Sequence, residues 1–295
     1  MIFEKAKIWI IASRPHTLSA AVVPILVGTA LAFQAGRFDW LLFLLTLMGA
    51  LLVQVGTNLT DEFADHGTPA SGEKFPAPHK VIARGLLSQR AVMGGAAVVF
   101  GLATLIGGWL VWVTGWPLLV VCLISLSAAY GYSAGPWPLG DFALGELTVF
   151  LLMGPVMVGA TYFVQARQLT GEVLAYSLPV AALVSAILIV NNLRDREEDS
   201  KGGRWTLTTL FGETAVRLLY SGLLVLAFAI PLREALLRET GLLLLPWLTL
   251  PLALMILIRI WRHGEKAQLH RVLKATSALH LLFGLLLALG VVLGG

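Results

Sequence analysis

A chain of 295 residues that is 57% hydrophobic and only 13% charged is too apolar for a soluble domain, in which about 25% of residues are charged. Its formal net charge of +4 is modest and no nucleic-acid-binding motif accompanies it, so we expect no nucleic-acid partner. The apolar stretches are continuous and do not alternate, which argues against a transmembrane barrel. The composition therefore predicts an all-α polytopic membrane protein in a lipid bilayer.

Nine membrane spans are predicted along the chain. A helix of about 20 apolar residues crosses a bilayer, and the spans are stretches poor in acidic and basic residues. The longest such stretch, 91–140, holds two spans that "TGWP" at 114–117 separates. The predicted spans of one membrane domain, 1–295, lie near 15–36, 40–60, 91–113, 117–134, 146–166, 173–193, 213–232, 240–258 and 275–295. Before them, residues 1–14 mix charged and apolar side chains and predict a helix in the membrane interface.

The distribution of basic residues predicts the orientation. Nine spans put the two termini on opposite sides of the membrane, with seventeen Lys and Arg residues on the side of the N-terminus and four on the other. Segments rich in Lys and Arg stay in the cytoplasm. We therefore expect the N-terminus inside and the C-terminus outside the plasma (inner) membrane of a prokaryote.

One acidic pattern, N-x-x-D-x-x-x-D, occurs twice, 134 residues apart, each time where an apolar span ends. Its residues are Asn58, Asp61 and Asp65 in the first copy and Asn192, Asp195 and Asp199 in the second. Helical residues four apart share a face, and carboxylates that close repel each other unless a cation joins them. Magnesium is held by one or two carboxylates together with water and phosphate oxygens. The repeat therefore predicts two cytoplasmic carboxylate clusters that hold Mg²⁺ against a diphosphate.

Three other interpretations of the acidic motifs are open. They could be solvated loop charges, although a repeat with a matched Asn is hard to explain in that way. An ion-coupled secondary transporter also carries paired acidic motifs, but its charges should lie near the bilayer midplane, and here they lie at span ends. A phospholipid-forming phosphotransferase should carry a D-G-x-x-A-R element, which this chain lacks.

The whole chain resembles the UbiA superfamily of intramembrane prenyltransferases, and within it the 1,4-dihydroxy-2-naphthoate prenyltransferase branch. The matching motifs are N-N-L-R-D-R-E-E-D at 191–199, Y-S-A-G-P-W-P-L at 132–139, A-L-G-E at 143–146, R-P-H-T-L at 14–18 and V-I-A-R-G-L-L-S at 81–88. Arg204 stands where the branch usually has Lys. Asp61 and Glu62 stand where the branch has Asn-Asp, so either of them could be the metal ligand.

The resemblance implies nine helices around a central cavity and a Mg²⁺-dependent transfer of a polyprenyl group from polyprenyl diphosphate to an aromatic acceptor. In this branch the acceptor is 1,4-dihydroxy-2-naphthoate, which loses its carboxyl group to give demethylmenaquinone in menaquinone biosynthesis. Another acceptor, such as 4-hydroxybenzoate, is the alternative.

Site residues follow from the motifs, from the four-residue spacing of Lys80 and Arg84, and from the cost of placing a carboxylate such as Glu146 in a membrane. The predicted catalytic carboxylates are Asp61, Asp65, Asp195 and Asp199, and these with Glu62 are the predicted metal ligands. The predicted diphosphate-binding residues are Asn58, Asn192, Lys80, Arg84 and Arg194. The predicted residues facing the acceptor or the prenyl cation are Arg14, Tyr132 and Glu146.

Overall fold

The computed structural model describes residues 2–66, 80–132, 138–262 and 264–294, and within these ranges every regular element is helical. The predicted all-α class is therefore confirmed. The α-helices of the bundle are α2 (Ser19–Gln34), α3 (Trp40–His66), α4 (Gln89–Thr114), α5 (Trp116–Gly131), α6 (Gly145–Leu151), α7 (Met157–Ala166), α8 (Gly171–Arg194), α10 (Leu207–Leu237), α11 (Leu250–Arg262) and α12 (Lys266–Gly294). The other elements are α1 (Ile2–Ala12), η1 (Pro15–Thr17), η2 (Leu139–Asp141), η3 (Leu152–Val156), α9 (Arg196–Lys201) and η4 (Gly241–Thr249).

Within the described residues, each predicted span overlaps one helix or several consecutive helices. In the described part of the chain, eight such segments are long and apolar enough to cross a membrane. The ninth, α5, is apolar but has only 16 residues. The predicted start of one span at residue 213 follows Gly212, whose φ of 81° interrupts the regular backbone of α10.

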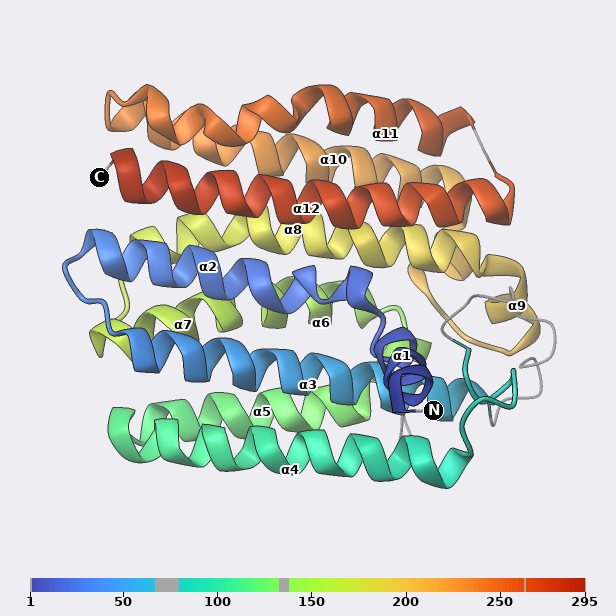
Figure 1. Ribbon diagram of the computed structural model, residues 1–295. Helices are drawn as coiled ribbons and strands as arrows, with labels where there is room; N and C mark the ends of the chain where they lie inside the picture. Colours follow the sequence, from blue (N-terminus) through green and yellow to red (C-terminus); the bar gives the residue numbers. More distant parts are fainter. Residues whose placement is uncertain (1, 67–79, 133–137, 263, 295) are drawn as a thin grey trace.

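The long helices run side by side, and α8 lies at the centre of the bundle (Figure 1). It packs against α10 and α12 on one side and against α2, α6 and η3 on the other. In its most apolar window 78% of residues are buried, against 17% in α3 and α4. A helix that is apolar all round belongs in such a position, and α8 carries the second acidic motif at its end.

Both acidic motifs lie at the same end of the bundle (Figure 1). The chain leaves α3 at this end, and α8 continues there into α9, whereas the C-terminus lies at the opposite end. Two motifs that are far apart in sequence are therefore close enough to build one site.

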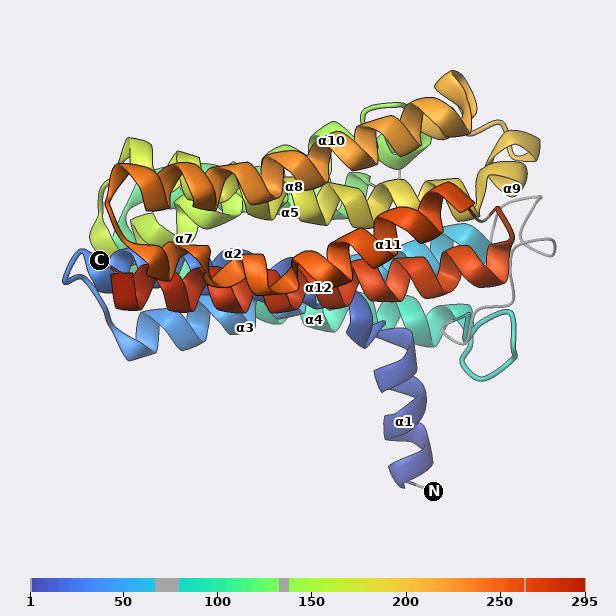
Figure 2. The same ribbon diagram turned by 90° about the horizontal axis from the view of Figure 1, so that it is seen from above.

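Helix α1 lies crosswise to the long helices and projects from the bundle at the end that carries the motifs (Figure 2). Ile8, Trp9 and Ile11 pack on a small apolar cluster formed by residues of α3, α4 and the segment at 81–82. The aromatic ring of Trp9 fills the space that a side chain at Gly95 would need. A helix with this orientation suits the predicted position in the membrane interface.

The span at 145–166 contains a π-helical turn, η3, between α6 and α7. Pro155 has no N–H to continue the regular hydrogen-bond ladder, and a wider turn accommodates it. Gly154 lies so close to Ala181 of α8 that an added methyl group would overlap it. The turn therefore brings Leu152 and Met153 to the wall of the central cavity.

Candidate active site

A cavity of about 260 Å³ lies inside the bundle, between α3, α5, α6, η3 and α8. Its polar lining comprises Arg14, His16, Thr17, Gln54, Thr57, Asp61, Lys80, Ser125, Tyr132, Thr148, Asn191, Asn192, Arg194, Asp195 and Arg204. Its apolar lining comprises Ala20, Val53, Ala128, Ala129, Val149, Leu152, Met153, Met157, Val184, Ile187, Leu188 and Leu273.

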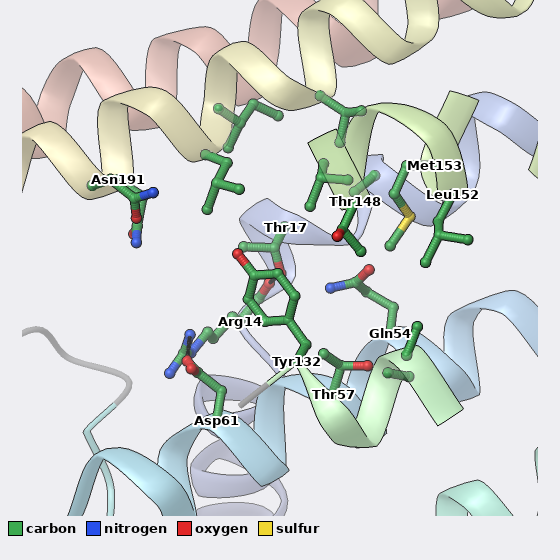
Figure 3. Close-up of a pocket in the computed structure, with 18 of the residues that line it drawn as sticks. Arg14, Thr17, Gln54, Thr57, Asp61, Tyr132, Thr148, Leu152, Met153 and Asn191 are labelled. Atoms are coloured by element: carbon green, nitrogen blue, oxygen red, sulfur yellow. Dashed lines mark hydrogen bonds and ion pairs between the residues drawn. The ribbon is translucent and has the colours of Figure 1, made fainter. Parts of the chain in front are cut away.

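The charged and the apolar parts of the lining lie at different ends. Figure 3 shows Arg14 and Asp61 beside each other at one end, Leu152 and Met153 at the other, and Tyr132 between them. Four basic side chains and two carboxylates line the cavity, so its charged end carries excess positive charge. Such a cavity matches an amphiphile that has an anionic head and an apolar tail.

The first motif supplies Asp61, whose carboxylate pairs with Arg14. Arg14 precedes η1 and has a left-handed backbone, with φ 50° and ψ 68°. Glu62, the neighbour of Asp61, is only 1% exposed and lies outside the cavity lining. The Glu62 carboxylate accepts a hydrogen bond from the Ile82 N–H at 3.0 Å, and its second oxygen lies 3.9 Å from Lys80 Nζ. Asp61 therefore lines the cavity, while Glu62 fastens the segment that presents Lys80.

The second motif supplies Asp195, which is held by its neighbour Arg194 through two hydrogen bonds of 2.7 and 2.5 Å. Arg194 also donates to the side-chain oxygen of Asn191 at 2.9 Å. Asp199 is 1% exposed, lies outside the cavity lining and accepts from Arg204 at 3.0 Å. Asp199 therefore holds a side chain of the cavity lining, Arg204, and does not line the cavity itself.

A buried carboxylate, Glu146 of α6, lies next to the cavity wall. Its side chain is 5% exposed, and its Oε1 atom accepts a hydrogen bond from Asn192 Nδ2 at 2.9 Å. Tyr132 packs against Gly140 and Gly145, and its ring lines the cavity. The predicted acceptor-facing residues Tyr132 and Glu146 are therefore neighbours, whereas Arg14 lies at the charged end with Asp61.

Some predicted site residues lie elsewhere or are not described. Asn58 is buried behind the cavity wall, where it contacts Ser13 and Thr17. Arg84 is exposed and lies outside the cavity lining. Asp65 lies in the last turn of α3, but its side chain is outside the described part of the structure.

Sequence reasoning missed several lining residues. Gln54 and Thr57 lie seven and four residues before Asp61, on the same face of α3. This polar stripe in an apolar span was the signal that could have identified them. Asn191 stands inside N-N-L-R-D-R-E-E-D, Arg204 follows this motif by five residues, and His16 stands inside R-P-H-T-L. None of these patterns shows which way a side chain points.

The residues of the cavity fit a magnesium ion that is bound together with a diphosphate. Asp61 and Asp195 line the cavity, one from each motif, and offer the oxygen atoms that Mg²⁺ prefers. In the described ranges, no three His, Cys, Asp or Glu side chains converge closely enough to hold a metal ion. Such an ion takes one or two carboxylates from the protein and its other ligands from water and phosphate.

Comparison with known proteins decides the family. Residues 21–283 match the UbiA prenyltransferase family. This chain belongs to the UbiA prenyltransferase family. The superfamily inferred from the motifs is thereby confirmed.

Two relatives are named 1,4-dihydroxy-2-naphthoate octaprenyltransferase. The protein of Bacillus subtilis (strain 168) is 36% identical over 200 residues, which are 68% of this chain and 64% of that relative. The protein of Haemophilus influenzae Rd is 28% identical over 308 aligned positions, which cover 100% of this chain and 98% of that relative. The resemblance to this branch of the UbiA family therefore extends beyond the motifs.

A UbiA homolog from Archaeoglobus fulgidus, solved bound to GPP and Mg²⁺, has a similar structure with a TM-score of 0.65. The match covers 95% of this chain and 99% of that chain at 16% sequence identity. This likeness shows the shared fold of an integral membrane protein.

Proposed function

We propose that this protein transfers a polyprenyl group from polyprenyl diphosphate to 1,4-dihydroxy-2-naphthoate, with loss of the carboxyl group, in the synthesis of menaquinone. The observation that carries the proposal is a cavity with a basic, carboxylate-bearing end and an apolar end, lined by residues of both repeated motifs. The names of the bacterial relatives support this acceptor.

The charged end is proposed to bind the diphosphate. Arg14, Lys80, Arg194 and Arg204 surround it, and bidentate guanidinium groups suit phosphate oxygens. Asp61 and Asp195 would hold Mg²⁺, and Asp61 is favoured over Glu62 because it faces the cavity. When bound, the ion supplies the charge neutralisation that makes diphosphate a better leaving group.

The apolar walls are proposed to bind the prenyl chain and to exclude water. An allylic cation would form as the carbon–oxygen bond breaks, and water would otherwise capture it. Tyr132 offers the face of its ring beside this position, and aromatic faces attract cations. Glu146, next to Tyr132, would hold the hydroxyl group of the acceptor. The ring carbon of the acceptor that bears the carboxylate would attack the cation to form the new carbon–carbon bond, and the carboxylate would then leave as CO2, which restores the aromatic ring.

The charged end is proposed to open to the cytoplasm. Seventeen of the 21 Lys and Arg residues belong to segments on the side of the N-terminus and the two motifs. The water-soluble acceptor and the released diphosphate would then enter and leave on the side where metabolism supplies and consumes them.

A reconstitution assay tests the proposal. Purified protein with Mg²⁺ and a labelled polyprenyl diphosphate should prenylate 1,4-dihydroxy-2-naphthoate, and EDTA should abolish the product until Mg²⁺ is restored. Mass spectrometry would identify the product in a panel that includes 4-hydroxybenzoate. Faster transfer to another acid would overturn the acceptor assignment, and full turnover in chelator would overturn the proposed metal dependence.

Two substitutions connect the activity to the site. Asp61→Asn and Asp195→Asn should each lower kcat by about a hundredfold to a thousandfold, as loss of a single electrostatic stabiliser does. Glu197→Gln is the matched control, because Glu197 lies in α9 near the same motif and its side chain is 67% exposed. Equal losses in all three variants would show that the two Asp residues have no special role.

A further inference from the structure

The side-chain N–H groups of the asparagines in the two repeated motifs donate hydrogen bonds to other segments of the protein. Asn58 Nδ2 donates to the Ser13 carbonyl at 2.8 Å and to Thr17 Oγ1 at 2.9 Å, which uses both of its N–H groups. Its Oδ1 accepts from Gln54 at 3.4 Å. Asn58 is 5% exposed and lies outside the cavity lining.

The two groups that accept hydrogen bonds from Asn58 lie on either side of the Arg14 backbone. The Ser13 carbonyl belongs to the peptide group before Arg14, and the Thr17 hydroxyl donates to the carbonyl of Arg14 itself at 2.9 Å. Asn58 thus fixes both sides of a left-handed backbone that a non-glycine residue rarely adopts. The conformation directs the Arg14 guanidinium to Asp61, which follows Asn58 by one turn of α3.

The second copy of the motif repeats this arrangement with a different partner. Asn192 Nδ2 donates to Glu146 Oε1 at 2.9 Å, and Ser185 of the same helix donates to the Glu146 backbone carbonyl at 3.3 Å. The other carboxylate oxygen, Oε2, is buried and meets no hydrogen-bond partner among the residues that the structure describes. Asn192 therefore fixes one oxygen of Glu146, and within the described residues the other oxygen remains available to a donor such as a hydroxyl group of the acceptor.

We propose that both asparagines are positioning residues for the transfer reaction, and that each acts through a charged residue of another segment. Asn58 acts through Arg14 at the diphosphate end, and Asn192 acts through Glu146 at the acceptor end. The inference rests on the proposed function. It replaces the expectation that both side chains bind the diphosphate directly.

Double-mutant cycles test these pairs. The first cycle combines Asn58→Ala with Arg14→Ala, and the second combines Asn192→Ala with Glu146→Gln. Each Asn variant should lower kcat/KM by about tenfold to a hundredfold, the range seen when a partner that orients a ligand is removed. Within a pair the double variant should be no slower than its slower single variant, because the Asn acts only through its partner.

The crossed pairs provide the control. Asn58→Ala with Glu146→Gln, and Asn192→Ala with Arg14→Ala, should give losses that multiply. Asn58→Ala should raise the KM for prenyl diphosphate, and Asn192→Ala should raise the KM for the acceptor. A general loss of folding would not raise the two KM values selectively. Melting temperatures measured on the same samples would reveal any such loss of folding.

Asn58→Asp separates positioning from metal binding. Aspartate keeps the oxygen that a metal would need but loses both N–H donors, so this variant should be as slow as Asn58→Ala. Near-normal activity of Asn58→Asp, or multiplicative losses within the first pair, would overturn the proposed role of Asn58. Multiplicative losses within the second pair would overturn the proposed role of Asn192. A wild-type protein without any prenyl transfer would overturn the proposed function and this inference with it.

Discussion

Arg204 joins two segments of the candidate site, α9 and η2, through its planar guanidinium group. It donates to Asp199 at 3.0 Å, to Asp141 at 2.5 Å and to the Gly140 carbonyl at 3.4 Å. Asp199 belongs to the second motif, whereas Asp141 and Gly140 precede the helix that carries Glu146. The side chain thus ties the second motif to the segment that precedes Glu146, and so connects the proposed diphosphate end to the proposed acceptor end.

We expect Arg204→Lys to lower kcat/KM by roughly tenfold, because an ammonium group cannot reproduce the planar fork and a hydrogen bond to a charged group contributes about 1.5–3 kcal/mol. Arg196→Lys is the matched control: Arg196 is 41% exposed and pairs with Glu213, so its rate should stay within about twofold of wild type, as expected for a surface pair. Steady-state kinetics on both variants make the comparison. Equal rates would show that the positive charge alone matters at position 204.

Substitution of Glu146 should separate two steps of the proposed reaction, the release of diphosphate and the transfer to the acceptor. If this carboxylate serves the acceptor, Glu146→Gln should still release diphosphate slowly and yield prenyl alcohol, yet transfer poorly to the aromatic acid. Diphosphate release without acceptor, measured beside product formation, distinguishes the steps. Loss of diphosphate release as complete as in Asp195→Asn would contradict a division between the two ends.

At the level of single residues, spacing and resemblance predicted side chains that do line the cavity, among them Asp61, Lys80, Arg194 and Asp195. The spacing of residues along a helix determines which face of the helix a side chain occupies. It does not determine which residue of another segment that side chain contacts. Asn58 shows the limit, because its partners lie about 40 residues earlier in a turn whose backbone conformation no local pattern reveals.

Among the elements, the positions of the spans were predictable because charge-free runs of membrane length are rare in other contexts. The internal break at η3 was not predicted, although G-P at 154–155 was a visible signal. Whether such a pair ends a helix or widens one turn depends on the neighbouring helix. Here α8 approaches Gly154 so closely that the turn is held against Ala181.

This contact gives a prediction for the helix pair. Gly154→Ala should lower the melting temperature and the rate, because the new methyl group pushes η3 from α8 and displaces Leu152 and Met153 from the cavity wall. Gly101→Ala on α4 is the control: nothing lies within 4 Å of its added methyl group, so stability should be unchanged or slightly higher. Thermal unfolding in detergent would compare the two variants. A similar melting temperature for both would contradict the tight packing of η3 on α8.

For the whole molecule, the charge asymmetry predicts which end faces the cytoplasm. In a background with Cys122 replaced by Ser, Gln168→Cys should react with an impermeant thiol reagent in intact cells. Ser200→Cys should react only after the membrane is permeabilised. Residues 168 and 200 are both exposed, one in the connection between α7 and α8 and the other in α9, so access to the reagent is matched. The opposite labelling pattern would invert the proposed orientation.

If α1 lies in the membrane interface as predicted, its crosswise position also sets the depth of the candidate active site in the bilayer. The helix ends at Ala12, and the next carbonyl, that of Ser13, accepts the hydrogen bond from Asn58. A helix lying among the lipid headgroups would therefore keep the basic end of the cavity level with them. A polyprenyl diphosphate carries its own charges at this level and its tail among the acyl chains. The substrate could then enter by lateral diffusion alone, without lifting its tail out of the membrane or drawing its head down into it.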